Sequence, residues 1–185
     1  LIVVFSGLLP SERLRAGHVI GALFGFAGAA IIITEGGVGL SAEHLTGYLL
    51  ALAAAFTWAG YSVLSRVVGD APTASVAVFC LATALLSLPL HFMFEQTTLP
   101  ATALGWASIA GLGLGPVGFA FYVWDIGCKR GDIQLLGTSS YTAPLLSTLA
   151  LIVVGIASPG MTLLWAALLI TGGAIIAARA SMSKK

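Results

Sequence analysis

The chain has 185 residues, of which 58% are hydrophobic and only 8% are charged, and its mean hydropathy is +1.04. Soluble domains carry about 25% charged residues, so this composition excludes the soluble globular class and indicates an integral membrane protein. The formal net charge is +1 and no basic patch is present, which gives no sign of a nucleic-acid partner. The expected fold class is therefore all-α and integral to the membrane.

Several apolar stretches are long enough to cross a bilayer, and short connections with turn residues separate them. They are expected at Gly17–Thr34, Leu45–Ser65, Ala74–Phe94, Leu104–Ile126, Ile133–Ala157 and Thr162–Ala180. Leu1–Leu9 precedes them and is expected to be the tail of one more helix, whose beginning would lie upstream of residue 1.

The charged residues are distributed unevenly among the connections. All eight Lys and Arg residues fall in alternate connections: Arg13, Arg15, Arg66, Lys129, Arg130, Arg179, Lys184 and Lys185. The intervening connections carry Glu35, Glu43 and Glu95 instead. Because cytoplasmic loops of membrane proteins are enriched in Lys and Arg, this pattern predicts a multi-pass protein with a cytoplasmic C-terminus.

The stretch Ile133–Ala157 differs from a plain membrane anchor, because its first half carries a carboxamide and many hydroxyls. One helical face holds Gln134, Thr138, Tyr141 and Thr148, and Ser140 adds a further hydroxyl. Polar groups in hydrocarbon are costly unless they are partnered, so this face is expected to line a cavity or a bundle interior. Pro144 lacks a backbone donor and is expected to expose a carbonyl one turn earlier. The pattern predicts one wall of a substrate pathway, although hydroxyls that bond their own helix would also produce it.

Two other stretches contribute candidate site residues. Trp58 and Tyr61 share a face of Leu45–Ser65 away from the interfacial belt, which suggests stacking against an aromatic substrate; packing or lipid contact is the alternative. In Leu104–Ile126 one face carries small residues and Tyr122, and Gly115-Pro116 interrupts the helix near its middle. Broken helices at this depth are typical of substrate sites and hinges, whereas close packing through glycine is the competing explanation.

Glycines also indicate helix contacts and a repeat. Gly17, Gly21 and Gly25 form a doubled Gly-x-x-x-Gly ridge, which is expected to pack against a neighbouring helix. The segment Gly28–Ile32 (Gly-Ala-Ala-Ile-Ile) is matched by Gly172–Ile176 (Gly-Gly-Ala-Ile-Ile) in a helix of opposite expected direction. Similar helices in opposite orientation are typical of the inverted-topology repeats of secondary transporters.

Two motifs resemble a known family. Glu12-Arg-Leu followed by Gly21 and Gly28 resembles the pattern that closes the first repeat of EamA-type transporters, in the drug/metabolite transporter superfamily. The segment Trp124–Gly131 (Trp-Asp-Ile-Gly-Cys-Lys-Arg-Gly) and Ser140–Ser147 (Ser-Tyr-Thr-Ala-Pro-Leu-Leu-Ser) are similar to the bacterial aromatic amino acid exporters of that superfamily.

This resemblance implies a ten-helix fold of two inverted five-helix repeats, of which about six and a half helices are present here. Residues 1–35 would end the first repeat and residues 36–45 would form an external connection. Residues 46–182 would be the second repeat, and residues 183–185 a cytoplasmic tail. Glu12 is expected to serve helix entry rather than substrate binding.

The implied function is secondary transport in the bacterial inner membrane, with small organic solutes, above all aromatic amino acids, exported by alternating access. A drug or general metabolite exporter of the same superfamily is the alternative. The candidate substrate residues are Trp58, Tyr61, Tyr122, Gln134, Thr138, Ser140, Tyr141 and Pro144, and the candidate hinge residues are Gly115, Pro116 and Gly118. The expected partners are the substrate, the bilayer and the upstream half of the fold, with no enzyme activity, cofactor, metal or nucleic acid.

Other function classes have weaker support. Gly137-Thr-Ser-Ser140 matches the Gly-x-Ser of intramembrane serine hydrolases, but these need a later His, and His18 and His91 both precede it. An inert helical scaffold leaves the polar stripes unexplained. Apart from Arg179, one residue before the end of the last one, the predicted spans contain no Lys or Arg, which argues against phosphorylated substrates that need buried cations. Asp125 is expected to pair with the basic residues that follow it.

Overall fold

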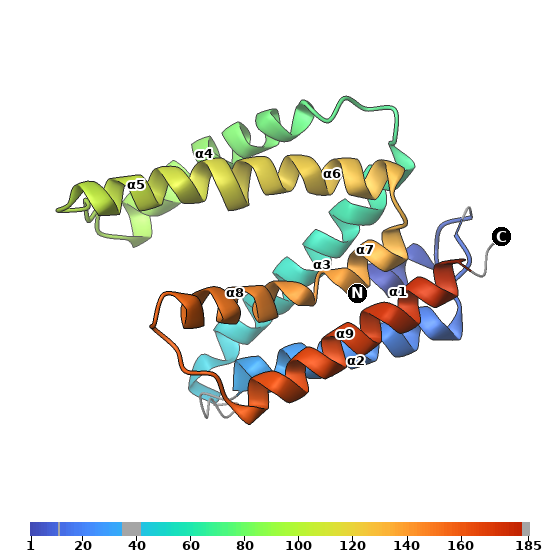
Figure 1. Cartoon of the computed structure of the whole chain (residues 1–185). Coiled ribbons are helices and arrows are strands. Elements are labelled where there is room, and N and C mark those ends of the chain that lie inside the picture. The colour runs from blue at the N-terminus through green and yellow to red at the C-terminus, as the bar shows by residue number, and fades with distance from the viewer. Residues whose placement is uncertain (11, 35–41, 183–185) are drawn as a thin grey trace.

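The computed structural model describes residues 1–10, 12–34 and 42–182, and every regular element in them is helical (Figure 1). The elements are α1 (Ile2–Ser6), α2 (Ala16–Thr34), η1 (Ala42–His44), α3 (Leu45–Val67), α4 (Ser75–Phe94), α5 (Ala103–Leu112), η2 (Gly113–Phe119), α6 (Ala120–Arg130), α7 (Ile133–Ser139), α8 (Thr142–Val153) and α9 (Met161–Met182). Within these residues, 6 helical spans are long and apolar enough to cross a membrane. The prediction of an all-α, multi-pass membrane protein is confirmed.

The predicted spans agree with the helices to within a few residues, with two differences. The span predicted at Leu104–Ile126 continues to Arg130, and the span predicted at Ile133–Ala157 ends at Val153 after dividing into α7 and α8. Most of the predicted connection 36–45 and all of the predicted tail 183–185 lie outside the described residues.

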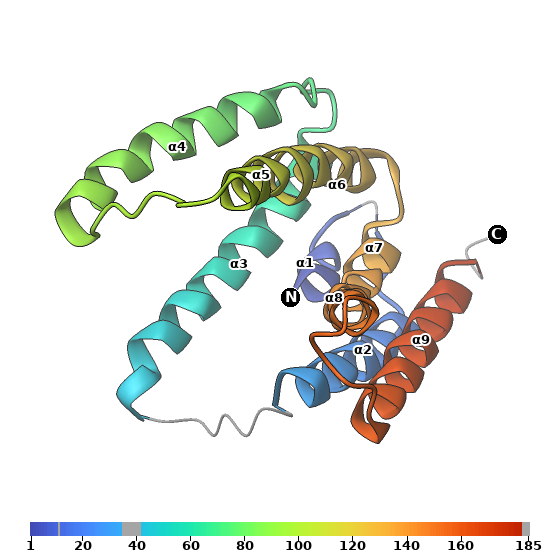
Figure 2. The same ribbon diagram turned by 60° about the vertical axis from the view of Figure 1, so that its left-hand side comes forward.

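The helices form two groups joined by α3. In Figure 1 and Figure 2, α4 lies beside the continuous rod of α5, η2 and α6, while α2 and α9 lie side by side at the other edge of the molecule. Helix α3 runs obliquely from one group to the other, and α1 and α7 pack where it crosses the middle. The small core at this crossing contains Ile2, Ala59 and Ile133, against which Trp58 and Trp124 pack.

Helices α2 and α9 make the closest contact in the fold. A Cβ added at Gly21 would lie 2.5 Å from the carbonyl oxygen of Gly173, and one added at Gly28 would lie 2.7 Å from Ile170. Gly17 faces Ala180 in the same way, so the two helices run antiparallel. The predicted packing role of the glycine ridge is confirmed, and its partner is the helix whose sequence it resembles.

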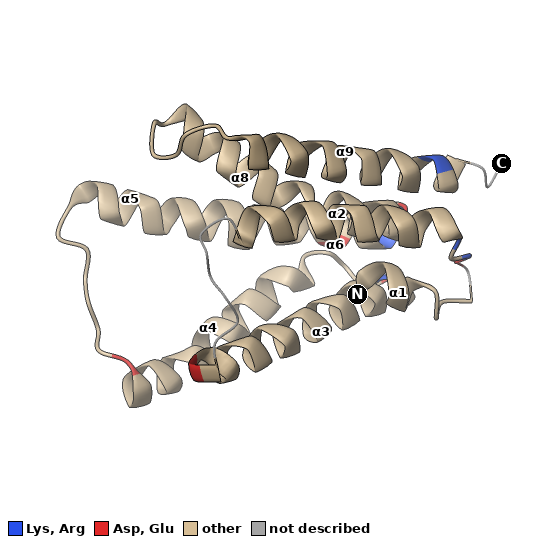
Figure 3. Cartoon of the chain, turned by 90° about the horizontal axis from the view of Figure 1, so that it is seen from below, with Lys and Arg blue, Asp and Glu red and all other residues tan. Residues whose placement is uncertain are grey.

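The ends of the bundle differ in charge. The Lys and Arg residues that the structure describes all lie toward the end that holds the C-terminus of α9 (Figure 3). Acidic residues lie at the opposite end, where α3 begins and α4 ends (Figure 3); Glu43 belongs to η1 before α3, and Glu95 follows the last residue of α4. The predicted alternation of basic connections therefore places these cations on one side of the bundle, which is called the basic end below.

The seam between α2 and α9 generates a prediction about stability. Gly21→Ala should lower the free energy of unfolding of the detergent-solubilised protein by about 1–3 kcal/mol, because the methyl group would overlap backbone atoms of α9. The melting temperature should fall accordingly. Gly172→Ala is the matched control, because a Cβ there meets no described heavy atom within 4 Å. Equal melting temperatures for the two variants would show that the seam is not closely packed.

Candidate substrate-binding site

A cluster of aromatic rings joins α3 to α6 inside the bundle. The ring of Trp58 lies 5.1 Å from that of Phe121, 5.5 Å from that of Trp124 and 5.6 Å from that of Tyr61, between centroids. The indole N–H of Trp124 donates to the Ser62 hydroxyl at 3.0 Å, and that hydroxyl donates to the Trp58 carbonyl at 2.8 Å. Trp58 is therefore held in position by the surrounding rings and by the hydrogen bonds that link Trp124, Ser62 and the Trp58 carbonyl, while part of its surface remains exposed.

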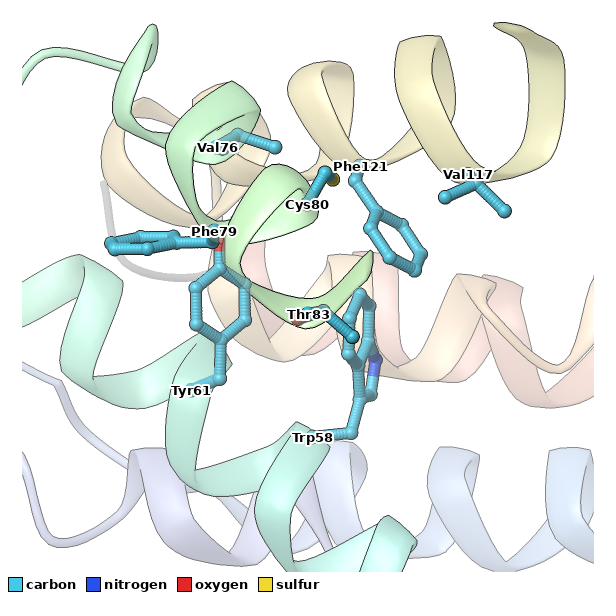
Figure 4. Close-up of a pocket in the computed structure, with 8 residues that line it drawn as sticks. All are labelled: Trp58, Tyr61, Val76, Phe79, Cys80, Thr83, Val117 and Phe121. Carbon is cyan, nitrogen blue, oxygen red and sulfur yellow. The ribbon is translucent and has the colours of Figure 1, made fainter. Parts of the chain in front are cut away.

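The first cavity beside Trp58, here called the aromatic cavity, lies between α3, α4 and the rod of η2 and α6 (Figure 4). Its volume is about 280 Å³, and its lining residues are Trp58, Tyr61, Val76, Phe79, Cys80, Thr83, Val117 and Phe121. In Figure 4 the rings of Trp58 and Tyr61 extend from α3 toward α4, and Phe121 approaches Trp58 from α6. Rings and aliphatic groups dominate this lining, so the cavity suits an apolar or aromatic group.

A second cavity, here called the polar cavity, shares Tyr61 and Phe79 with the first and has a volume of about 200 Å³. Its wall includes Asp125 and Lys129, whose side chains are 3% and 7% exposed and lie 2.6 Å apart. The Tyr61 hydroxyl donates to Asp125 at 3.2 Å, and Lys129 also donates to the Ala71 carbonyl at 2.9 Å. A buried ion pair thus adjoins the aromatic cavity.

The pairing expected for Asp125 is confirmed, but the expectation that no cation lies within a span is wrong. Helix α6 continues to Arg130, so Lys129 lies inside the helix and is buried by α3 and by the connection to α4. Lys129 is therefore a buried cation, but Asp125 neutralises it, and this pairing leaves no excess positive charge for a phosphorylated substrate.

Arg66 ties three segments together at the basic end. Its guanidinium donates to the carbonyl oxygens of Cys128, Lys129 and Gly131, which terminate α6. It also donates to Glu12 at 2.7 Å, and the Glu12 side chain is only 4% exposed. A cation at a helix C-terminus is favourable because the last carbonyls carry partial negative charge. Glu12 therefore links the segment before α2 to α3, and its role in helix entry stays a prediction.

A third cavity, here called the Tyr141 cavity, lies on the other side of Trp58 and has a volume of about 490 Å³. Its lining includes Trp58, Phe56 and Ala59 of α3, residues of α1, and Gly137, Ser140 and Tyr141 around the α7–α8 junction. The Tyr141 ring packs on Gly25, whose added Cβ would lie 2.6 Å from Cδ2, and it meets the Phe26 ring edge-on at 6.3 Å. The structure thus brings the predicted residues Trp58, Ser140 and Tyr141 to one cavity and places Trp58 between two.

The polar face of α7 and α8 differs from the prediction. The Ser140 hydroxyl donates to the Gly137 carbonyl, and the Thr138 and Thr148 hydroxyls donate to carbonyls four residues earlier. Pro144 exposes no free carbonyl, because the Ser140 carbonyl accepts the Ala143 N–H at 3.1 Å when the chain tightens at the α7–α8 junction. The hydroxyls therefore bond their own helix, which was the competing explanation.

Gln134 and Thr138 are buried, with 0% and 1% of their surfaces exposed. Among the described residues, neither polar atom of the Gln134 side chain has a hydrogen-bond partner. Both residues lie on the packed side of α7, while Pro144 is half-buried at the start of α8. Of the face predicted on this stretch, Ser140 and Tyr141 are the residues that line the Tyr141 cavity.

The predicted interruption at Gly115-Pro116 takes the form of a π-helix, η2, within a continuous rod. The Ala120 N–H bonds the Gly115 carbonyl five residues earlier, a wider turn than that of an α-helix. A Cβ at Gly115 would meet no described heavy atom within 4 Å, and one at Gly118 would meet its own helix, at the Gly113 carbonyl. Close packing through these glycines is thus not what the described structure shows, and their role as a hinge remains a prediction.

Several lining residues were not predicted. Tyr122 is 44% exposed, and its neighbour Phe121 is the residue that contacts Trp58. Cys80 and Thr83 lie three residues apart on α4, a spacing visible in the sequence that could have identified a face. Val117 and Phe79 carry no such signal, because nearly every neighbour of each in the chain is also apolar.

The hydrolase alternative finds no geometric support in the described part of the chain. His18 hydrogen-bonds Ser181 on α9 at 3.2 Å, and His91 lies between Glu95 and Thr97 at the far end of α4. The Ser140 hydroxyl donates to its own helix. Within the same residues, no group of three or more His, Cys, Asp or Glu side chains could hold a metal ion.

The tie made by Arg66 yields a prediction. Arg66→Met should lower the free energy of unfolding by about 3–5 kcal/mol, because the buried carboxylate of Glu12 would lose the guanidinium that faces it at 2.7 Å. Arg130→Met is the control, because Arg130 is exposed at the same helix end and should change stability by about 0.5 kcal/mol or less. Melting temperatures in detergent would test this difference, and equal losses would contradict it. Glu12→Gln combined with Arg66→Met should recover part of the loss.

Comparison with known proteins gives a consistent picture. Residues 45–179 match the EamA-like transporter family. The chain is 52% identical over 179 residues to the aromatic amino acid exporter YddG of Ancylobacter novellus, covering 96% of this chain and 62% of that protein. It is 32% identical over 103 residues to YddG of Salmonella typhimurium, covering 55% of this chain and 34% of that protein. An uncharacterized transporter of Acidianus ambivalens is 29% identical over 152 residues, covering 80% of this chain and 57% of that protein.

A solved crystal structure superposes with a TM-score of 0.90 at 50% identity, covering 95% of this chain and 61% of that chain. The chain thus spans less than two thirds of the length of these relatives. The apolar spans, the seam of α2 and α9 and the family match agree with the resemblance found in the sequence. The chain belongs to the EamA-like transporter family.

Proposed function

We propose that the protein is a secondary transporter that exports aromatic amino acids across the bacterial inner membrane by alternating access. The observation that carries the proposal is Trp58, which offers a fixed aromatic surface to cavities on both of its sides. Rings stack favourably on such a surface in addition to their burial. The names of the relatives in Ancylobacter novellus and Salmonella typhimurium support the choice of substrate.

The proposed architecture is a ten-helix fold of two inverted five-helix repeats. Residues 1–35 would end the first repeat, and residues 46–182 would form the second. The antiparallel packing of α2 and α9, two helices that share a Gly-x-Ala-Ile-Ile segment, supports this relation. The basic end would face the cytoplasm, with the C-terminus, because cytoplasmic loops are rich in Lys and Arg.

Substrate would pass between the two sides of Trp58 as the helices move. At the basic end, Arg66 and the Asp125–Lys129 pair tie α3 to α6 and would close the path there. The π-helix η2 would be the hinge, because Pro116 removes a backbone donor and Gly115 and Gly118 leave the backbone free to change conformation. A shift of η2 would move Val117 and Phe121 at the wall of the aromatic cavity.

A drug or general metabolite exporter is the second candidate, favoured by the predominantly apolar lining of the aromatic cavity. The two candidates differ in selectivity. An amino acid exporter should transport zwitterionic aromatic solutes in preference to apolar cations of similar size. Competition between labelled tryptophan and such cations in the same proteoliposomes would separate them.

The transport proposal predicts a specific effect at Trp58. In proteoliposomes of the full-length protein, Trp58→Ala should reduce kcat/KM for labelled tryptophan by about tenfold, because a stacking surface worth about 1.5 kcal/mol is lost. Trp165→Ala is the control, because Trp165 is 58% exposed on α9. Unchanged transport in Trp58→Ala would remove Trp58 from the site. If no aromatic amino acid is transported by the folded protein, the proposed function is wrong.

The hinge leads to a second transport prediction. Gly115→Ala should lower kcat for tryptophan several-fold and leave KM nearly unchanged, because the added methyl group fits the described structure but restricts the backbone of η2. Gly111→Ala is the matched control, since its Cβ also meets no described heavy atom within 4 Å but lies in the α-helix α5. Equal kcat values for the two variants would contradict the hinge.

A further inference from the structure

The buried pair of Asp125 and Lys129 is more than a helix-end contact. Ionisable side chains inside a membrane protein are costly and usually mark a functional site. Both side chains are less than a tenth exposed, and both line the polar cavity. Tyr61 and Phe79 belong to the walls of the polar cavity and of the aromatic cavity, so the ion pair borders the place where a ring would bind.

The pair keeps some capacity for a ligand. An ammonium group has three donors, and within the described residues Lys129 uses two of them, for Asp125 and for the Ala71 carbonyl. The donors near Asp125 other than Lys129 are hydroxyl groups, those of Tyr61 at 3.2 Å and of Ser65 and Thr73 nearby. A ligand ammonium would displace such a hydroxyl, because charge-assisted hydrogen bonds are about twice as strong as neutral ones.

We propose that the aromatic cavity and the polar cavity together form one site for an aromatic zwitterion. The ring lies against Trp58 and Phe121, the ligand carboxylate accepts the remaining N–H of Lys129, and the ligand ammonium donates to Asp125. This inference rests on the proposed function and adds to it the residues that recognise the charged end of the amino acid. The two volumes, about 280 and 200 Å³, together fall within the usual range of small-molecule sites.

The charge balance of the site favours a zwitterion over other aromatic solutes. Asp125 and Lys129 neutralise each other, so a ligand with net charge would leave one charge in excess in a buried region. A zwitterion adds one charge of each sign and keeps the region neutral. An uncharged aromatic ligand would occupy the aromatic cavity only and leave the polar cavity unused.

The test measures binding without requiring transport. Cys80 lines the aromatic cavity and is partly exposed, whereas Cys128 is completely buried. Alkylation of Cys80 by a maleimide in the detergent-solubilised full-length protein, followed by peptide mass spectrometry, would report occupancy of the cavity. The probes are L-tryptophan, tryptamine and indole-3-propionate, which carry both charged groups, the ammonium only and the carboxylate only.

In the wild-type protein, L-tryptophan should protect Cys80 best. Lys129→Met should weaken protection by tryptophan and by indole-3-propionate about ten- to a hundredfold, whereas protection by tryptamine should be retained or strengthened, because its ammonium neutralises the unpaired Asp125. Asp125→Asn should weaken protection by tryptophan and by tryptamine, whereas protection by indole-3-propionate should be retained or strengthened, because its carboxylate neutralises the unpaired Lys129. Glu95→Gln, an exposed carboxylate at the other end of α4, should change none of the three.

A purely structural ion pair would give a different result. Substitutions in such a pair would weaken protection of Cys80 by all three probes alike or by none of them, and either result would overturn the proposal. The combined variant Asp125→Leu and Lys129→Met removes both charges and should remain folded, since apolar replacement of a buried pair is often neutral. In that variant the three probes should protect about equally, and a retained preference for tryptophan would also overturn the proposal. If tryptophan is transported but never protects Cys80, this site is wrong and the proposed function stands.

Discussion

In a bilayer, helices gain little by covering apolar surface, because lipid chains are as apolar as the side chains that they would touch. This fold therefore depends on backbones that approach closely where side chains are small, and α2 and α9 do so along their length. Gly21 and Gly173 bring each backbone against the carbonyl of the other. The seam leaves no room for a cavity between these helices, so the cavities lie on the other side of α7 and around α3.

Polar ties supply the second means of holding helices together, and the structure concentrates the ties between α3 and α6 toward one end. Arg66 terminates α6 and reaches Glu12, while Asp125 joins Tyr61 of α3 to Lys129. The middle of α3 contacts α6 mainly through the rings around Trp58 instead. Rings slide and tilt at lower cost than a buried ion pair breaks, so α3 and α6 should separate more readily at their ring contacts than at the basic end.

The sequence predicted the helices well because length and hydropathy determine a membrane span almost alone. It also predicted that the basic residues lie at one end, because the spans fix which connections share a side of the bundle. The glycine ridge of α2 was also predictable, since small residues at a spacing of four have few uses in lipid. The residues that line cavities were predicted only in part. Trp58, Tyr61, Ser140 and Tyr141 line cavities, but Gln134 and Thr138 are packed on the inner side of α7.

The reason for that failure is physical. A hydroxyl on a membrane helix can donate its hydrogen bond to a carbonyl of the same helix, and the hydroxyls of Thr138, Ser140 and Thr148 do so. A polar stripe therefore does not distinguish a cavity from a packed face. A different cause explains why the sequence predicted Tyr122 and not Phe121 as the residue near Trp58. The π-helix η2 widens the turns ahead of α6 and changes which residue faces α3.

Selectivity in such a site depends on its polar part more than on its aromatic part. An apolar cavity distinguishes ligands that differ by a methylene or a hydroxyl only weakly, whereas buried polar groups left unpaired penalise a ligand that lacks their partners. The aromatic cavity alone would therefore accept many ring-containing solutes, as a drug exporter does. Asp125 and Lys129 at its border change this balance, because a ligand that fills the polar cavity without charged groups of its own gains no charge-assisted hydrogen bond from the buried pair. In the proposed site, the preference for a zwitterion over an apolar solute would then depend on this ion pair.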